Sequence, residues 1–325
     1  MNRMHLHLAI AALTLAFSAE TTRAQFHEWA GEPLPGVQIK TVAFKGWLPT
    51  RVEPLRGTIV LIPGRHGDGR GMAADSAWQE LGTAVGFAVI GCQFTDGDPS
   101  RYQGDEQGEV AKSINAAVSK LAALGKHPEL EKAPLAFWGT SAGSNVSSKY
   151  VDFFPDRVAA FASSKGTWGP GGMLGRGKDE IPMFFAVGMK DKPDWVSGSR
   201  TNVDVGLKKH APWTVAYQKN EGHDLGASLD VVRPFLKAAI ELRLTPSKAT
   251  AGPPSIFKTA PRTIGGSSTT TSPARLTKID RGSGWLGDPE ALEIAPAATF
   301  KGNKAKAIWL PDEATAKAWQ NYLRS

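Results

Sequence analysis

Residues 135–144 read LAFWGTSAGS, an apolar run that meets a glycine and continues in small residues. This pattern predicts a buried strand that turns sharply into a helix. The embedded GTSAG at 139–143 matches G-x-S-x-G, which in a strand–turn–helix setting is typical of a strained turn that exposes a nucleophilic serine. Gly139 and Gly143 would allow strand, turn and helix to approach closely. Ser141 is therefore a candidate nucleophile, if the chain also supplies a base, an acid and an oxyanion site.

Strand-like and helix-like segments alternate along residues 37–244. The run GTIVLI at 57–62 lacks polar alternation, which indicates a strand covered on both faces, as in a parallel sheet. Residues 109–124 place apolar side chains at helical spacing and predict an amphipathic helix. The alternation predicts an α/β fold with a doubly wound, mainly parallel sheet flanked by helices. The predicted strands are 37–48, 57–62, 87–94, 135–139, 157–162, 181–188 and 213–217, and the predicted helices are 73–85, 109–124, the stretch from Ser141 through Phe153, and 229–242.

The first 24 residues resemble a secretory signal peptide. A positive start, MNR, precedes an apolar run at 6–17, and small residues stand at positions 22 and 24, where a signal peptidase would read them. An uncleaved membrane anchor is the alternative, although the run is short for a bilayer. We therefore expect a secreted or periplasmic protein without stable membrane insertion, since no other segment of the sequence is apolar enough to cross a membrane.

The rest of the chain divides into a main part and a tail. We expect an α/β domain at 25–244, a connector rich in Pro, Gly, Ser and Thr at 245–284, and a small extension at 285–325. Roughly 40 residues cannot easily hold a core of their own, so the extension is expected to pack on the main domain. An independent binding module is the alternative. In the extension we predict short strands at 291–300 and 304–310 and a helix at 312–323, with Trp309, Leu310, Trp319 and Leu323 as anchors.

The composition is that of an ordinary globular protein. Hydrophobic residues make up 41% and charged residues 21% of the 325 residues, so a large core can form. The formal net charge is +7, but no Lys/Arg run is dense enough to indicate nucleic-acid binding. Cys92 is the only cysteine of the sequence, which excludes a disulfide within it, and its strand-like surroundings predict a buried structural thiol. Nothing in the sequence indicates an oligomeric state.

A serine nucleophile needs an adjacent base, and histidine suits that role because its ordinary pKa lies near neutrality. His223 follows the predicted strand at 213–217, within NEGHDLG at 220–226. Reacting groups in open α/β sheets collect beyond the C-terminal ends of the strands, so His223 is the best candidate base. His127 and His210 precede strands and would lie at the opposite end of the sheet. The other histidines after residue 24 are His27 and His66.

Asp191 and Asp194 are the candidates for a carboxylate that would fix the tautomer of the base and stabilise its imidazolium. Both follow the predicted strand at 181–188. Asp191 comes sooner after the strand end, where its side chain can reach across to the loop that carries His223, so we prefer it. The chain order serine, aspartate, histidine is the one expected for a nucleophile elbow in an α/β sheet.

The oxyanion of a tetrahedral intermediate needs two backbone donors. The residue after the nucleophile, Ala142, would supply one N–H. The other donor should come from the glycine-rich loop after the strand at 57–62. Pro63 has no N–H, so Arg65 or His66 is the expected donor, and we prefer Arg65.

The chain resembles an α/β-hydrolase over residues 37–244. Its four signature elements are short, but together and in this order they are much more specific than one alone. The helix after the elbow leads to FPDRVAA at 154–160, and this continuation is similar to secreted polyhydroxybutyrate depolymerases and to feruloyl and acetylxylan esterases. Two features depart from many of these relatives: Pro63 stands where they have histidine, and the chain lacks the disulfides that they often carry. The four elements are IPGR at 62–65, GTSAG at 139–143, GMKD at 188–191 and GHD at 222–224.

The resemblance implies a serine esterase, that is, a carboxylic ester hydrolase. It implies that Ser141, Asp191 and His223 form the catalytic triad, with Arg65 and Ala142 at the oxyanion hole. It further implies an ester substrate, either a small molecule or a group attached to a polymer, and neither a metal nor another cofactor. A serine peptidase or an acyltransferase on the same fold is one alternative, and a non-catalytic carbohydrate- or polymer-binding protein on a hydrolase scaffold is another.

Trp168 lies in KGTWGPGG at 165–172, a loop that follows a predicted strand end and should overhang the site. Its ring could form an acyl or aryl wall, or bind a sugar ring, so we expect Trp168 to contact the substrate. Trp195 is a weaker candidate, and a plain packing role is the alternative for both tryptophans.

Overall fold

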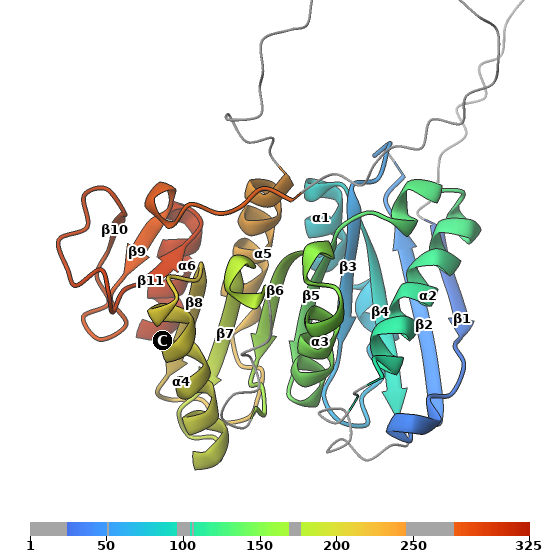
Figure 1. Ribbon diagram of the computed structural model, residues 1–325, viewed down its shortest axis with the longest axis horizontal. Helices are drawn as coiled ribbons and strands as arrows, with labels where there is room; N and C mark the ends of the chain where they lie inside the picture. The colour runs from blue at the N-terminus through green and yellow to red at the C-terminus, as the bar shows by residue number, and fades with distance from the viewer. Residues whose placement is uncertain (1–24, 51, 96–104, 106, 169–176, 245–275) are drawn as a thin grey trace, which may run out of the picture.

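The computed structural model describes most of the 325 residues of the chain (Figure 1). The predicted signal peptide at 1–24 and most of the predicted connector at 245–284 lie outside the residues that the structure describes, as do residues 169–172 of the loop that carries Trp168. The described residues are 25–50, 52–95, 105, 107–168, 177–244 and 276–325.

A large twisted sheet forms the centre of the molecule (Figure 1). Within the described residues it contains eight strands in the order β1-β2-β4-β3-β5-β6-β7-β8. The strands from β4 to β8 run parallel, whereas β2 runs antiparallel to both of its neighbours at one edge. This confirms the doubly wound, mainly parallel sheet predicted from the sequence. The strands are β1 Gln25–Ala30, β2 Thr41–Leu48, β3 Gly57–Ile62, β4 Phe87–Thr95, β5 Leu135–Thr140, β6 Val158–Ser164, β7 Met183–Gly188 and β8 Trp213–Gln218.

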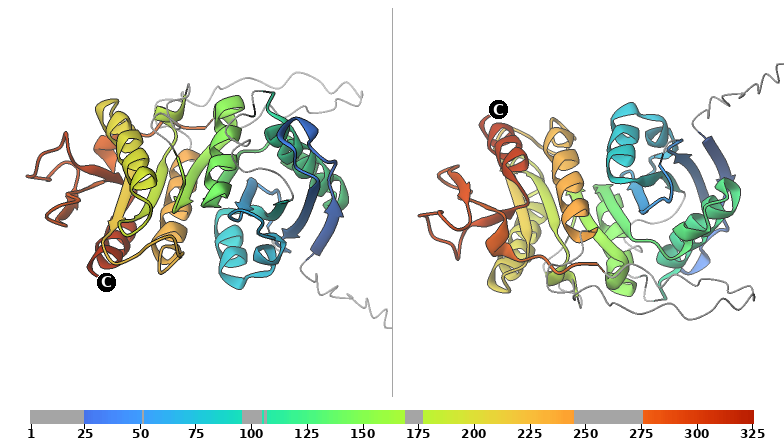
Figure 2. Two further views of the ribbon diagram at one scale, coloured as in Figure 1. Left: turned by 90° about the horizontal axis from the view of Figure 1, so that it is seen from below. Right: turned by 90° about the horizontal axis from the view of Figure 1, so that it is seen from above.

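Helices cover both faces of the sheet, which explains why β3 is buried along its whole length (Figure 2). Helices α1 and α5 pack on one face, and α2, α3 and α4 pack on the other. Helix α1 begins where the Asp75 carboxylate accepts the N–H groups of Ala77 and Trp78, at 3.0 and 3.2 Å. None of the helices in the described ranges is both long and apolar enough to span a membrane. The helices are α1 Ser76–Val85, α2 Glu109–Gly125, α3 Ala142–Phe153, α4 Pro193–Lys208 and α5 Leu229–Leu244.

Two differences from the sequence predictions occur at the antiparallel edge. The strand predicted at 37–48 begins only at Thr41, because Pro35–Val37 form a 3₁₀ turn before it. Strand β1 is not among the predicted strands. Its side chains are exposed or half-buried, so its sequence lacks the apolar pattern that marks the central strands.

The C-terminal segment packs beside β8 and α5, at the opposite edge of the main sheet from β1 (Figure 1). Trp309 and Trp319 are fully buried in the same apolar core as the main sheet. The Trp319 indole N–H donates to the Val215 carbonyl at 2.7 Å, and the Thr214 hydroxyl donates to the Trp309 carbonyl. The segment contains a small sheet in the order β10-β9-β11, with β9 Trp285–Gly287, β10 Ile294–Pro296 and β11 Ile308–Leu310, followed by helix α6 Glu313–Arg324.

Replacing Trp319 should reveal how strongly this segment is attached. We expect Trp319→Ala to lower the free energy of unfolding by about 3–5 kcal/mol, because it empties a buried aromatic site and leaves the Val215 carbonyl without its partner. Urea denaturation followed by circular dichroism measures this change. Lys317→Ala, on the exposed side of the same helix, is the control and should change the free energy by less than about 0.5 kcal/mol. Equal losses in the two variants would contradict the packing described here.

Candidate active site

Ser141 stands at the tip of a strained turn between β5 and α3. Its φ of 52° and ψ of −125° lie in a region that residues with a Cβ rarely adopt. The turn needs glycine on both sides. A Cβ on Gly139 would lie 2.5 Å from the Gly143 carbonyl oxygen, and a Cβ on Gly143 would lie 2.2 Å from the Ile62 carbonyl oxygen. The Ser141 N–H donates to the Ser164 carbonyl at 3.0 Å, which ties the turn to β6. The strained turn predicted from GTSAG is thus present.

Ser141, His223 and Asp191 form a continuous chain of hydrogen bonds. The Nε2 atom of His223 lies 2.8 Å from Ser141 Oγ, and its Nδ1 atom lies 2.6 Å from Asp191 Oδ2. The tautomer of His223 that donates from Nδ1 to the Asp191 carboxylate leaves Nε2 as an acceptor for the serine hydroxyl. The Asp191 side chain is 6% exposed and that of His223 is 38% exposed, so the acid lies inside and the base faces outward.

Asp191 and Asp194 differ in their hydrogen bonds and in their exposure. Asp191 Oδ1 accepts the N–H of Lys192 at 2.8 Å while Oδ2 meets His223, so both of its oxygens are engaged. Asp194 is exposed in the first turn of α4, which begins at Pro193. In this geometry His223 is hydrogen-bonded to Asp191 and not to Asp194.

The loops that carry Asp191 and His223 are packed backbone to backbone. They follow β7 and β8, which are neighbouring parallel strands. The Lys190 N–H donates to the Glu221 carbonyl at 2.9 Å. A Cβ on Gly188 would lie 2.0 Å from the Gly222 carbonyl oxygen, so only glycine allows this approach. The close contact fixes the spacing between the carboxylate and the imidazole.

Ala142 and the loop that carries Arg65 both lie beside Ser141. Ala142 is the first residue of α3, where backbone N–H groups have no acceptor within the helix. Gly64 lies directly against the nucleophile, since a Cβ built on it would be 3.2 Å from Ser141 Cβ. Arg65 follows Gly64, and its side chain is exposed and donates from Nε to His66 Nε2 at 2.9 Å. The N–H groups of Ala142 and Arg65 therefore remain the predicted donors.

Trp168 does not line the site, which corrects the sequence-based expectation. The side chain is only 2% exposed, and its ring packs against Phe185 and Phe161 with centroids 5.4 and 6.3 Å away. The aromatic ring beside the catalytic candidates belongs instead to Trp195, in the first turn of α4. Its centroid lies 4.8 Å from that of the His223 imidazole, and Lys192 Nζ lies 4.3 Å from its ring centroid.

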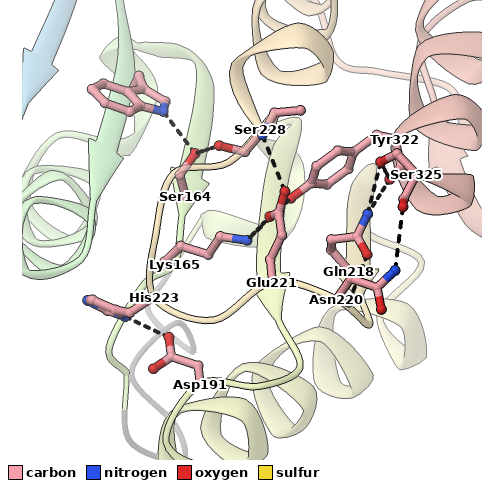
Figure 3. Close-up of polar contacts among 12 residues, drawn as sticks. Ser164, Lys165, Asp191, Gln218, Asn220, Glu221, His223, Ser228, Tyr322 and Ser325 are labelled. Atoms are coloured by element: carbon pink, nitrogen blue, oxygen red, sulfur yellow. Dashed lines mark hydrogen bonds and ion pairs between the residues drawn. The ribbon is translucent and has the colours of Figure 1, made fainter.

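An ion pair between a fully buried lysine and a half-buried glutamate lies beside His223, and the sequence analysis does not predict it. Lys165 Nζ donates to Glu221 Oε2, and the Tyr322 hydroxyl donates to the same oxygen at 2.5 Å (Figure 3). Burial works against the charged form of Glu221, but the hydrogen bonds from Lys165 and Tyr322 outweigh it and hold the pKa of Glu221 below its ordinary value. Burial, together with Glu221, raises the pKa of Tyr322. The only local signal in the sequence is the position of Glu221 two residues before His223.

Cys92 is fully buried in β4, as the sequence predicts. Burial raises the pKa of its thiol, which keeps it protonated and unreactive. Across the described ranges, no three residues among His, Cys, Asp and Glu are grouped so that they could hold a metal ion.

Comparison with known proteins identifies the fold. No protein-family model matches the sequence, and no curated protein matches it. A solved structure of a ferulic acid esterase aligns with 68% of this chain and 99% of its own, with a TM-score of 0.51 and 10% sequence identity. The chain has the α/β-hydrolase fold. An S-formylglutathione hydrolase from Staphylococcus aureus also aligns, over 67% of this chain and 97% of its own, with a TM-score of 0.47 and 13% identity. The α/β-hydrolase fold hosts many activities, so the chemistry must be argued from the site.

The elbow of this α/β-hydrolase fold has room only for glycine at position 143. We expect Gly143→Ala to destabilise the protein by more than about 2 kcal/mol, because the added methyl group would press on the carbonyl oxygens of Ile62 and Pro63. Gly71→Ala is the matched control, since a Cβ there meets nothing within 4 Å. Urea denaturation of both variants measures the difference. Wild-type stability in Gly143→Ala would show that the elbow is not as tightly packed as described.

Proposed function

We propose that the protein is a serine esterase that hydrolyses carboxylic esters through Ser141, His223 and Asp191. The proposal is supported above all by one observation: His223 contacts Ser141 Oγ at 2.8 Å through Nε2 and Asp191 Oδ2 at 2.6 Å through Nδ1. A serine hydroxyl becomes an effective nucleophile only with an adjacent base that a third group orients. The strained backbone of Ser141, which presents its side chain at the tip of the elbow, adds to this support.

In the acylation half-reaction, Ser141 Oγ attacks the carbonyl carbon of the ester as His223 Nε2 takes the hydroxyl proton. The new C–O bond pushes the carbonyl electron pair onto oxygen and gives a tetrahedral oxyanion. Asp191 stabilises the imidazolium through Nδ1–H. When the oxyanion collapses, the bond to the leaving alcohol breaks, and the proton on His223 Nε2 passes to the alcohol oxygen. An acyl group then remains on Ser141.

In the deacylation half-reaction, water takes the place of the alcohol. His223 Nε2 removes one proton from water while the water oxygen bonds to the acyl carbon. Collapse of the second tetrahedral oxyanion breaks the bond to Ser141 Oγ, which recovers its proton from His223. The products are a carboxylic acid and the free enzyme, so each turnover consumes one ester and one water.

We assign the two oxyanion donors to the backbone N–H groups of Ala142 and Arg65. The position of Ala142 at the start of α3 and the contact of Gly64 with Ser141 support this assignment. Donors of this kind act on charge that develops only in the transition state, and each contributes about 3–4 kcal/mol. No metal or other cofactor is needed for these steps.

The substrate class is a carboxylic ester on a small molecule or on a polymer. We propose Trp195 as an aromatic wall of the site, because its ring contacts His223 from the first turn of α4. The signal-peptide pattern at 1–24 supports a secreted or periplasmic enzyme that meets its substrate outside the cytoplasm.

Substitutions in the triad test the proposal. With short p-nitrophenyl esters as substrates, Ser141→Ala and His223→Ala should lower kcat by roughly 10⁴- to 10⁶-fold, and Asp191→Asn by roughly 10⁴-fold. Asp194→Asn is the matched control and should retain kcat within about twofold. Steady-state kinetics, with circular dichroism to verify folding, provides these values.

Three results would contradict the proposal. The first is that the wild-type protein hydrolyses none of the p-nitrophenyl esters. The second is a larger loss of kcat in Asp194→Asn than in Asp191→Asn. Matched amide substrates supply the third, since faster cleavage of the amides than of the esters would indicate a peptidase.

Trp195 should influence substrate affinity more than the chemical step. We expect Trp195→Ala to raise KM for esters of aromatic acids by roughly fivefold, which corresponds to about 1 kcal/mol for a lost aromatic contact. KM for acetyl esters should change little. Trp168→Phe, in the buried cluster, is the control and should leave both KM values unchanged. A KM effect in Trp168→Phe without one in Trp195→Ala would contradict the assignment of Trp195 as the aromatic wall.

A further inference from the structure

A fully buried lysine lies beside the candidate active site. Lys165 directly follows β6, has a φ of 56°, and its side chain is 0% exposed. Its ammonium group donates to Glu221 Oε2 and, at 3.2 Å, to the Tyr322 hydroxyl (Figure 3). A buried charge is costly unless it is paired and hydrogen-bonded, and such a pair is weak evidence for stability in itself. Because the pair lies beside His223, it indicates a role in the function of the site and not only in stability.

Glu221 connects this lysine to the turn that carries His223. Its Oε1 atom accepts the Ala227 N–H at 3.3 Å, so the carboxylate closes the turn from 221 to 227. Its backbone carbonyl accepts the Lys190 N–H at 2.9 Å, next to Asp191. Glu221 thus belongs to the loop that carries His223 and also contacts the loop that carries Asp191.

The third member of the network comes from the C-terminal helix. Tyr322 of α6 is 4% exposed, and its hydroxyl donates to Glu221 Oε2 at 2.5 Å across 101 residues of sequence. The backbone of α6 is held at the same place, because Gln218 Nε2 donates to the Tyr322 carbonyl at 2.5 Å and to Ser325 Oγ at 3.2 Å. Helix α6 therefore contacts the end of β8 and the start of the His223 turn.

We propose that Lys165, Glu221 and Tyr322 form a positioning network through which the C-terminal helix α6 sets the place of the His223 imidazole between Ser141 and Asp191. The inference rests on the proposed esterase function and extends it to the tail of the chain. The network touches neither substrate nor reacting atoms, so its members are positioning residues. Misplacement of a catalytic group by about 1 Å can cost roughly 100-fold in rate, so a modest loosening of this turn is measurable.

Tyr322→Phe is the mildest test, because it removes one hydroxyl and keeps the ring. We expect kcat to fall roughly tenfold with KM within about twofold of wild type. Trp319→Phe is the matched control: it removes the hydrogen bond from α6 to Val215 but does not touch Glu221, and it should lower stability without lowering kcat. Equal kcat losses in the two variants would mean a general loosening of α6 and would overturn the proposal.

A double-mutant cycle tests whether Tyr322 acts through Glu221. The reference variant is Lys165→Met with Glu221→Gln, which removes both charges of the pair together and leaves no unpaired lysine. When Tyr322→Phe is added to this reference variant, kcat should stay within about twofold of the value for the reference variant. A full tenfold additional loss would show that Tyr322 acts by another route and would overturn the proposal.

A spectroscopic readout separates this inference from the esterase proposal. The Nδ1 proton of His223, hydrogen-bonded to Asp191, should give a low-field proton NMR signal in the free protein that disappears in His223→Ala. In Tyr322→Phe this signal should shift or broaden, while in Trp319→Phe it should stay unchanged. If the wild-type protein shows the signal but hydrolyses no ester, the esterase proposal fails. The network is then tested by the NMR signal of Tyr322→Phe alone. A Tyr322→Phe variant with the wild-type signal and wild-type kcat would overturn the network.

Discussion

The close approach of the β3 end to the start of α3 is the constraint on which the site depends. The carbonyl oxygens of Ile62 and Pro63 lie so near Gly143 that no side chain fits there. This contact forces the chain to reverse at Ser141 in a conformation that is costly for a residue with a Cβ. The strain is sustained because buried parallel strands and helices on both faces fix the turn at its two ends. The same contact brings Gly64, and with it the predicted oxyanion loop, against the serine.

The second condition for chemistry is that two loops from adjacent strands remain in register. Asp191 and His223 follow β7 and β8, and the backbone contact of Gly188 with Gly222 sets their separation. Glu221 also contacts Lys165 and Tyr322, so the C-terminal helix is linked to the loop that carries His223. The site thus combines a strained serine, fixed by backbone packing, with a histidine whose turn makes polar contacts with Lys165 and Tyr322 through Glu221.

The sequence predicts those parts of the molecule that depend on local pattern and chain order. Apolar runs identify the parallel strands, and the strand-end rule places Ser141, Asp191 and His223 at the same end of the sheet. The prediction that Trp168 contacts the substrate is wrong because a loop position does not reveal which way a side chain turns. Here Gly166 allows the ring to fold back, since a Cβ there would lie 2.7 Å from the indole. Tyr322 could not be predicted, because its contact with Glu221 spans 101 residues and no periodicity reports it.

The residue that reacts covalently with a fluorophosphonate shows whether Ser141 is the nucleophile. Wild-type protein is treated with the reagent, the modified residue is located by peptide mass spectrometry, and the adduct is crystallised. We predict one new phosphorus–oxygen bond, to Ser141 Oγ, with loss of fluoride and with the phosphoryl oxygen directed at the backbone N–H groups of Ala142 and Arg65. Reaction at a different serine, or an unmodified Ser141 after prolonged exposure of folded protein, would contradict it.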